Sequence, residues 1–365
     1  MEKKTNSCVA NGASLSAESL NQQQWTKYHT RGGHGFAAED ANAMADAFRG
    51  KPVDKVGMAN ALDGPDRISG CVPIQTKYYS SASQSVDAAF RNGEYRYQGM
   101  KLEVPSDQYE EAVRRFAELT DPQTARQTVI RGSVTYEEAC NIAKAGNLDS
   151  ITFDVKTQSV ACGITCGLSF VVIYAKAVLD GKSHGEALKE AGKASAKAGM
   201  TTMALGVATQ QLLRTTVGRS AAAPVTHAIR PVVNSAMATG LGRAALTPVA
   251  SAMAGKQVAG AAARSVLTAG ARANVITGAA FSAAAVGSNI YKCCKGKMSA
   301  GECAKESVAD VAGIGGGMAG FSAGAAIGTC IPIPVVGTLA GGLIGGAIGS
   351  IASSGAVKGF FGLFK

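Results

Sequence analysis

The chain has 365 residues and a net charge of +10, with 46% hydrophobic and 17% charged residues. That length allows two or three domains. The nine cysteines are scattered, odd in number and without repeated CxxC pairs. This argues against a disulfide framework or a zinc site and indicates a reducing, cytoplasmic-type compartment for the soluble part. The N-terminus is polar and leads into no apolar stretch, so we expect no cleavable secretory signal.

Residues 1–105 mix polar turns with short strand-like runs, which predicts a soluble α/β domain with a mixed sheet flanked by helices. A helix is expected directly after Gly32-Gly33-His34-Gly35. The amides of this glycine-rich turn suit an anion, although a plain turn before a helix is the more common use of such a sequence.

The most informative segment of this domain is GPDRISGCVPIQTKYY, residues 64–79. It predicts two strands, at about 66–68 and 71–78, joined by a two-residue turn at Ser69-Gly70. With that turn Asp66 lies opposite Pro73.

Alternation of side chains along these strands has a chemical consequence. It places Asp66, Gln75 and Lys77 on one face of the hairpin, while Val72, Ile74, Thr76 and Tyr78 point the other way. An acid, an amide and a lysine therefore converge on one surface. The alternative is an ordinary hairpin in which Lys77 and Arg67 are solvated.

The converging residues resemble the core of PD-(D/E)XK nucleases, in the Mrr-like variant where Gln replaces the second acid. The resemblance covers roughly residues 30–105. It implies a Mg²⁺ ion held by Asp66 and by the backbone beside Gln75. It also implies that Lys77 orients or activates water, or stabilises the phosphate charge, in phosphodiester hydrolysis.

Such nucleases often supply an acid from a preceding helix, and the resemblance implies Glu39 for this role, with Asp40 second. It also requires a helix after the second strand, which we expect from Ser83 to Phe90. Further along, residues 94–104 predict another hairpin that turns at Gln98-Gly99.

Residues 106–156 are charged and helical, and we interpret them as a connector. One helix is expected after Pro105-Ser106-Asp107. A second begins at Thr135, where Glu138 three residues later forms a capping box.

Residues 157–297 are predicted to be small-residue helices within or on a membrane. The uncharged runs 157–175 and 273–291 are long enough to span a bilayer, and 198–213 is a weaker candidate. Between Glu190 and Glu302 there are twelve cations and no acid, which favours an anionic lipid surface over nucleic acid as partner. A soluble all-α bundle is the alternative.

Residues 298–365 carry two lines of glycine, and no residue from Val311 to Val357 is charged. A spacing of four places each line on one helix face, where another backbone can approach closely. We expect a membrane-inserted helical hairpin at about 311–329 and 335–352, with prolines at the turn, and a capacity for homo-oligomers; a flexible tail is the alternative. The glycines used for helix packing are Gly316, Gly320, Gly324, Gly328, Gly337, Gly341, Gly345 and Gly349.

These patterns predict a soluble α/β domain followed by an all-α, Gly/Ala-rich, membrane-associated region. The first functional hypothesis is a membrane-tethered nuclease that acts on DNA with Mg²⁺ in defence or toxicity. The second is a non-enzymatic protein whose glycine lines oligomerise and permeabilise or remodel a membrane. A structural membrane protein without catalysis is the third.

Overall fold

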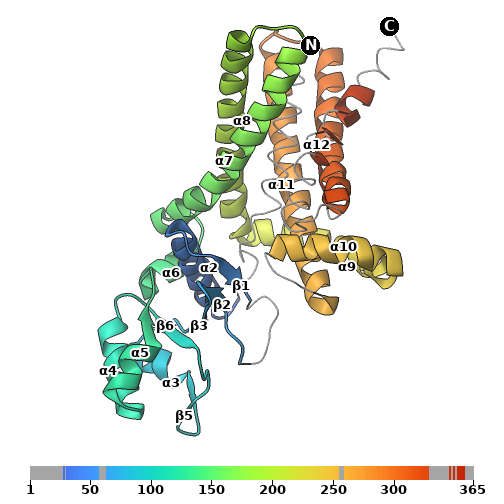
Figure 1. Ribbon diagram of the computed structural model, residues 1–365. Coiled ribbons are helices and arrows are strands. Elements are labelled where there is room, and N and C mark those ends of the chain that lie inside the picture. The colour runs from blue at the N-terminus through green and yellow to red at the C-terminus, as the bar shows by residue number, and fades with distance from the viewer. Residues whose placement is uncertain are drawn as a thin grey trace. The chain divides into compact units, whose positions relative to one another are not determined.

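The computed structural model describes residues 28, 30–56, 63–254, 259–328, 345–346, 348–349 and 352–357. They divide into two compact units. The sheet unit comprises the described parts of 23–154 together with 210–219, and the helical unit the described parts of 155–209 and 220–365. An α/β part followed by a mostly helical part is the predicted fold class, which is confirmed (Figure 1).

A five-stranded mixed sheet organises the sheet unit. Its strand order is β1-β2-β3-β6-β7; β1, β2 and β3 are antiparallel neighbours, and β3, β6 and β7 run parallel. Parallel neighbours need a crossover, which here is made by helices between the strands. The strand bounds are β1 Val53–Lys55, β2 Arg67–Ser69, β3 Val72–Thr76, β6 Lys101–Val104 and β7 Val129–Arg131.

Helices cover both faces of this sheet. On one face α2 (Gly33–Phe48) and α6 (Tyr136–Ile142) share a small apolar core that includes Tyr78. On the other face α3 (Ala82–Asp87), α4 (Tyr109–Leu119) and α5 (Pro122–Thr128) pack on the apolar residues of β6. The sheet therefore has two distinct sides, and the alternation of side chains decides which residue serves which side.

Two predicted helix starts are confirmed in this unit: α4 begins at Tyr109, after Pro105-Ser106-Asp107, and α6 begins at Tyr136, after Thr135. Thr135 caps α6, and its hydroxyl and the Glu138 carboxylate form the reciprocal capping box. Between α3 and α6, however, the chain also contributes β7 to the sheet. Residues 106–154 belong to the same compact unit as the sheet.

The β2–β3 hairpin differs from the prediction by one residue at its turn. Ser69 pairs with Val72, so Gly70 and Cys71 are the two turn residues. Their φ angles are +55° and +69°, as a type I′ turn requires at both central positions. Asp66 thus lies opposite Gln75, not Pro73. The change keeps Asp66, Gln75 and Lys77 on one face, because both registers have the same parity.

The hairpin expected at 94–104 is wrong. β5 (Glu94–Tyr95) pairs instead with β4 (Phe90–Arg91) in a separate two-stranded sheet, while β6 joins the central sheet beside β3. Both β5 and β6 have the composition of strands. β6 pairs with β3 because this position buries Leu102 and Val104 in the core.

The helical unit is built from long helices. The bounds of these helices are α7 Leu148–Leu179, α8 His184–Leu213, α9 Thr216–Ala238, α10 Gly240–Ala254, α11 Gly260–Cys294 and α12 Ala300–Gly328. The first residues of α7 and α9 and the last residues of α8 belong to the sheet unit.

Among the described residues, α7 alone is long and apolar enough to cross a membrane, and 22% of its most apolar window is buried. It contains the predicted run 157–175. The other long run, 273–291, lies within α11, which does not reach the same apolarity. The membrane-span candidates of the described residues thus reduce to one.

Candidate functional site

The β2–β3 hairpin brings Asp66 and Gln75 into direct contact. The Gln75 amide nitrogen Nε2 donates to Asp66 Oδ2 over 2.7 Å, and the Thr76 backbone N–H donates to the same oxygen over 2.8 Å. The Asp66 N–H in turn bonds the carbonyl of Ile74 over 2.9 Å. Backbone hydrogen bonds on both sides of the contact hold the carboxylate in one place.

Lys77 completes the group. Alternation directs its side chain to the same face as Gln75. Its ammonium Nζ lies 5.2 Å from the centre of the buried Tyr97 ring, an arrangement that attracts a cation.

Burial raises the pKa of Asp66, and the bond from Thr76 and the charge of Lys77 offset this only in part. A carboxylate in this position therefore lacks full compensation from the protein.

Glu39 does not join these three residues on their face of the sheet. It lies on α2, half-buried, three residues before Asn42. Asn42 reaches Glu103 and Tyr78 on the opposite face from Gln75. Asp40, the second candidate, accepts hydrogen bonds from Tyr28 and Lys55 over 2.7 and 2.8 Å. The structure thus assembles Asp66, Gln75 and Lys77, and places the two candidate acids of α2 elsewhere.

A buried charge cluster, which the sequence did not predict, fills the α2 face of the sheet. The Arg67 guanidinium binds both oxygens of Glu103 over 2.6 Å, and its Nη2 lies 3.0 Å from Asp46 on α2. The side chains of all three are at most 8% exposed. The alternative of a hairpin with a solvated Arg67 is therefore wrong for this residue. The spacing of four between Asn42 and Asp46 could have predicted this cluster, because it places two polar side chains on the same face of α2.

The cluster also supports the candidate site from behind. Thr76 Oγ1 donates to Glu103 over 3.0 Å, while the N–H of the same residue donates to Asp66. Thr76 therefore links the charge cluster on one face with the Asp66 carboxylate on the other.

A Mg²⁺ ion beside Asp66 would need oxygen ligands that are not already used in hydrogen bonds. Gln75 Oε1 is buried and has no hydrogen-bond partner among the described residues. An orphan oxygen beside a carboxylate fits a hard cation, and Mg²⁺ typically uses one or two carboxylates and keeps several waters. Within the part of the chain that the structure describes, no cluster of three His, Cys, Asp or Glu residues could hold a metal by itself. These residues therefore fit a Mg²⁺ ion that keeps most of its water ligands and has few protein ligands.

Replacing Asp66 with asparagine is expected to stabilise the fold at neutral pH. Because the folded pKa of Asp66 is raised, the protonated acid favours folding below the ordinary carboxyl pKa, and this advantage is lost as pH rises through the folded pKa. Asp66→Asn removes the buried charge and should raise the melting temperature, by about 2–4 °C for each kcal/mol gained. The exposed helix cap Asp121, whose pKa is lowered by Thr124, is the control: Asp121→Asn should not stabilise.

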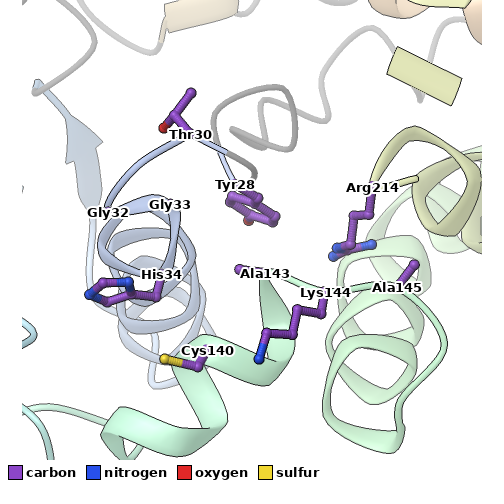
Figure 2. Close-up of a pocket in the computed structure, with 10 residues that line it drawn as sticks. All are labelled: Tyr28, Thr30, Gly32, Gly33, His34, Cys140, Ala143, Lys144, Ala145 and Arg214. Atoms are coloured by element: carbon purple, nitrogen blue, oxygen red, sulfur yellow. The ribbon is translucent and has the colours of Figure 1, made fainter. Parts of the chain in front are cut away.

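A pocket of about 380 Å³ lies elsewhere in the sheet unit, between the start of α2 and the end of α6. His34 and Arg214 stand on opposite sides of Tyr28 in Figure 2. Arg214 is fully buried and forms a two-pronged ion pair with Asp154 over 2.6 Å. The segment 210–219 is thereby tied into the sheet unit.

The anion cradle considered for the Gly32-Gly33-His34-Gly35 turn is not free to act. The Gly33 N–H donates to Thr30 and the Gly35 N–H to Gly32, over 2.8 and 2.9 Å. A Cβ at Gly33 would lie 1.7 Å from the Tyr28 carbonyl oxygen, so glycine is required here for a close backbone approach. The turn is thus a local cap of α2.

Part of the predicted glycine contact is visible in the helical unit. A Cβ at Gly316 would lie 2.4 Å from the Gly349 carbonyl oxygen, and one at Gly320 would lie 2.1 Å from that of Gly345. The two glycine lines therefore meet backbone to backbone at these residues. Gly337, Gly341 and the prolines of the expected turn lie outside the described residues, as do the side-chain surroundings of Gly324 and Gly328.

Comparison with known proteins gives two similarities, both partial. Residues 16–119 match the YeeR C-terminal domain family, which is less than a third of the chain. Over 87 residues the chain is 52% identical to "Inner membrane protein YeeR" of Escherichia coli (strain K12). That match covers 22% of this chain and 17% of the relative. No solved structure matches.

The matched family range contains Glu39, Asp66, Gln75 and Lys77. The matched range is therefore the part of this chain that carries the candidate site residues. Neither the name of the family nor that of the relative describes a nuclease; the relative is named as a protein of the inner membrane.

Proposed function

We propose that this chain is a membrane-associated protein whose sheet unit hydrolyses phosphodiester bonds of nucleic acid with Mg²⁺. The single observation that carries the chemistry is the contact between Asp66 and the buried Gln75, on the same face as Lys77. The helix–strand–strand–strand–helix–strand order of α2, β1, β2, β3, α3 and β6 supports it, because the nuclease resemblance implies a helix on each side of this hairpin.

Membrane association is supported by two further observations. α7 is apolar over a length that crosses a bilayer, and only 22% of its most apolar window is buried. The partial relative is an inner membrane protein. We place the sheet unit in a reducing, cytoplasmic-type compartment and anionic lipid beside the acid-free stretch.

In the proposed reaction each side chain has a separate task. Asp66 and the Gln75 oxygen and backbone would hold the Mg²⁺ ion, which when bound polarises the phosphate and lowers the pKa of water. Lys77 stabilises the negative charge that develops on the phosphate oxygens. The Tyr97 ring holds the Lys77 ammonium in position through the cation–π contact.

The test is cleavage of plasmid DNA and of RNA by the full-length protein in detergent with Mg²⁺. The full chain is needed because a fragment that ends near residue 156 would remove Arg214, the buried partner of Asp154. Lys77→Ala should lower the rate by about 10²-fold or more. Lys51→Ala is the matched control, since that side chain is 53% exposed and pairs with Asp46, which lies on the opposite face of the sheet from Lys77. Full activity of Lys77→Ala, or none in the wild type, would refute the proposal.

The second candidate is a non-enzymatic role in membrane permeabilisation or remodelling, favoured by the backbone contact of Gly316 and Gly320 with Gly345 and Gly349. The contact joins two glycine-bearing segments of one chain. Dye release from anionic liposomes that is lost in Gly320→Leu and kept in Lys77→Ala would favour this role over hydrolysis.

A further inference from the structure

The helices α11 and α12 form an antiparallel hairpin whose register is set by a buried asparagine. Asn289, 4% exposed, donates through Nδ2 to Ser307 Oγ over 3.4 Å and to Asp310 Oδ2 over 3.0 Å. Figure 1 shows the two helices side by side. Backbone hydrogen bonds hold the turn between α11 and α12. In one of them the Lys297 N–H donates to the Lys292 carbonyl over 2.9 Å.

This register places two cysteines opposite each other. One helical turn from Asn289 toward the connection is Cys293, and one turn from Ser307 toward the connection is Cys303. Burial, and next to it the nearby Cys303 thiol, raise the pKa of the Cys293 thiol, which agrees with that register. Both are free and only partly exposed. Cys294, next in sequence, is also free and is exposed.

We propose that Cys293 and Cys303 form a reversible disulfide that locks the α11–α12 hairpin. The oxidant is a small or protein disulfide: the thiolate of one cysteine attacks it, releases one thiol and forms a mixed disulfide. The second cysteine then displaces the other thiol, so that two thiols of the chain are oxidised and one external disulfide is reduced to two thiols. The pair lies outside the sheet unit, so the proposal is independent of the proposed hydrolysis.

The chemistry has a consequence for this chain. A disulfide across a short connection restricts the separation of the two helices. Cys293 and Cys303 would remain thiols in a reducing compartment and be cross-linked in an oxidising one. The redox state of the pair therefore reports on which side of a membrane this connection lies.

The experiment treats the full-length protein in detergent with diamide, alkylates the remaining thiols and digests without reductant. Cleavage after Lys292, Lys295, Lys297 and Lys305 should yield the peptide 293–295 linked to 298–305. Cys294→Ser should retain the linked peptide, whereas Cys293→Ser and Cys303→Ser should lose it. Oxidation should also raise the melting temperature of Cys294→Ser and leave that of Cys293→Ser unchanged.

Two results would overturn the proposal. One is a wild-type protein in which Cys293 and Cys303 are both alkylated after diamide treatment. The other is a Cys293→Ser variant that links Cys294 to Cys303 as efficiently as the wild type, because mere proximity of exposed thiols would then explain the cross-link.

Discussion

Replacing Arg67 with methionine is expected to cost the sheet unit about 3–5 kcal/mol, because removing one partner of a buried ion pair leaves the other charge without compensation. Here two acids lose their partner, because Arg67 pairs with both Glu103 and Asp46, whose side chains are 3% and 8% exposed. Methionine fills much of the same volume, so the effect reports on charge more than on a cavity.

Hydrogen exchange of backbone amides in β3 and β6 is the suitable measurement, since it gives the opening free energy of this unit separately from the helical unit. Arg49→Met is the matched control. Arg49 also pairs with Asp46, at 3.5 Å, but its side chain is 60% exposed, so the change should be below about 1 kcal/mol. Equal protection of β3 in Arg67→Met and the wild type would show that the cluster does not stabilise the sheet.

The same cluster predicts an acid dependence. Burial would raise the pKa of Asp46, but the hydrogen bonds and charge of Arg67 outweigh it and hold the pKa below its usual value of 3.8. A depressed carboxyl pKa contributes stability that is present above the usual value and is lost as pH falls through the folded pKa. Removing Arg67 should abolish this part of the acid transition.

Gly320→Leu and Gly315→Leu are expected to change the stability of α12 in opposite directions. A Cβ at Gly320 would lie 2.1 Å from the Gly345 carbonyl oxygen, so backbone must move, at a cost of about 3 kcal/mol or more. Gly315 faces open space with nothing within 4 Å. Leucine there should gain about 0.5–1 kcal/mol from helix propensity.

Detergent-purified variants can be compared by loss of helical circular dichroism on heating, with hydrogen exchange of residues 352–357 as the local readout. The pair tests position directly, because both changes add the same side chain to the same helix five residues apart. A similar shift for both variants would mean that the glycine contact carries no packing energy.

The sequence was sufficient to predict which residues share a face of the β2–β3 hairpin but not the register of the hairpin. Strand alternation has a period of two, so the face shared by Asp66, Gln75 and Lys77 survives the move of the turn from Ser69-Gly70 to Gly70-Cys71. The turn itself was mispredicted because a cysteine with φ of +69° has no local signature.

Local sequence patterns could not predict which strands pair with each other in the sheets. The segment 94–104 has the residues of a hairpin, yet β5 pairs with β4 and β6 pairs with β3. Glu39 was assigned to the site from its helix alone, while the face that α2 presents to the sheet depends on packing against β2 and β3. Arg67 looked like a surface residue for the same reason.

By itself the sequence determined the two-part character of this protein, the capping box of α6, the apolar run of α7 and the spacing of the glycines, all of which are local or periodic properties of the chain. The tertiary structure alone decided which partners those features meet: Arg67 with Glu103, Gly320 with Gly345, and Arg214 with Asp154. Each of these contacts joins residues at least 25 positions apart. Their energy comes from desolvation and close approach, which exist only once the chain has folded.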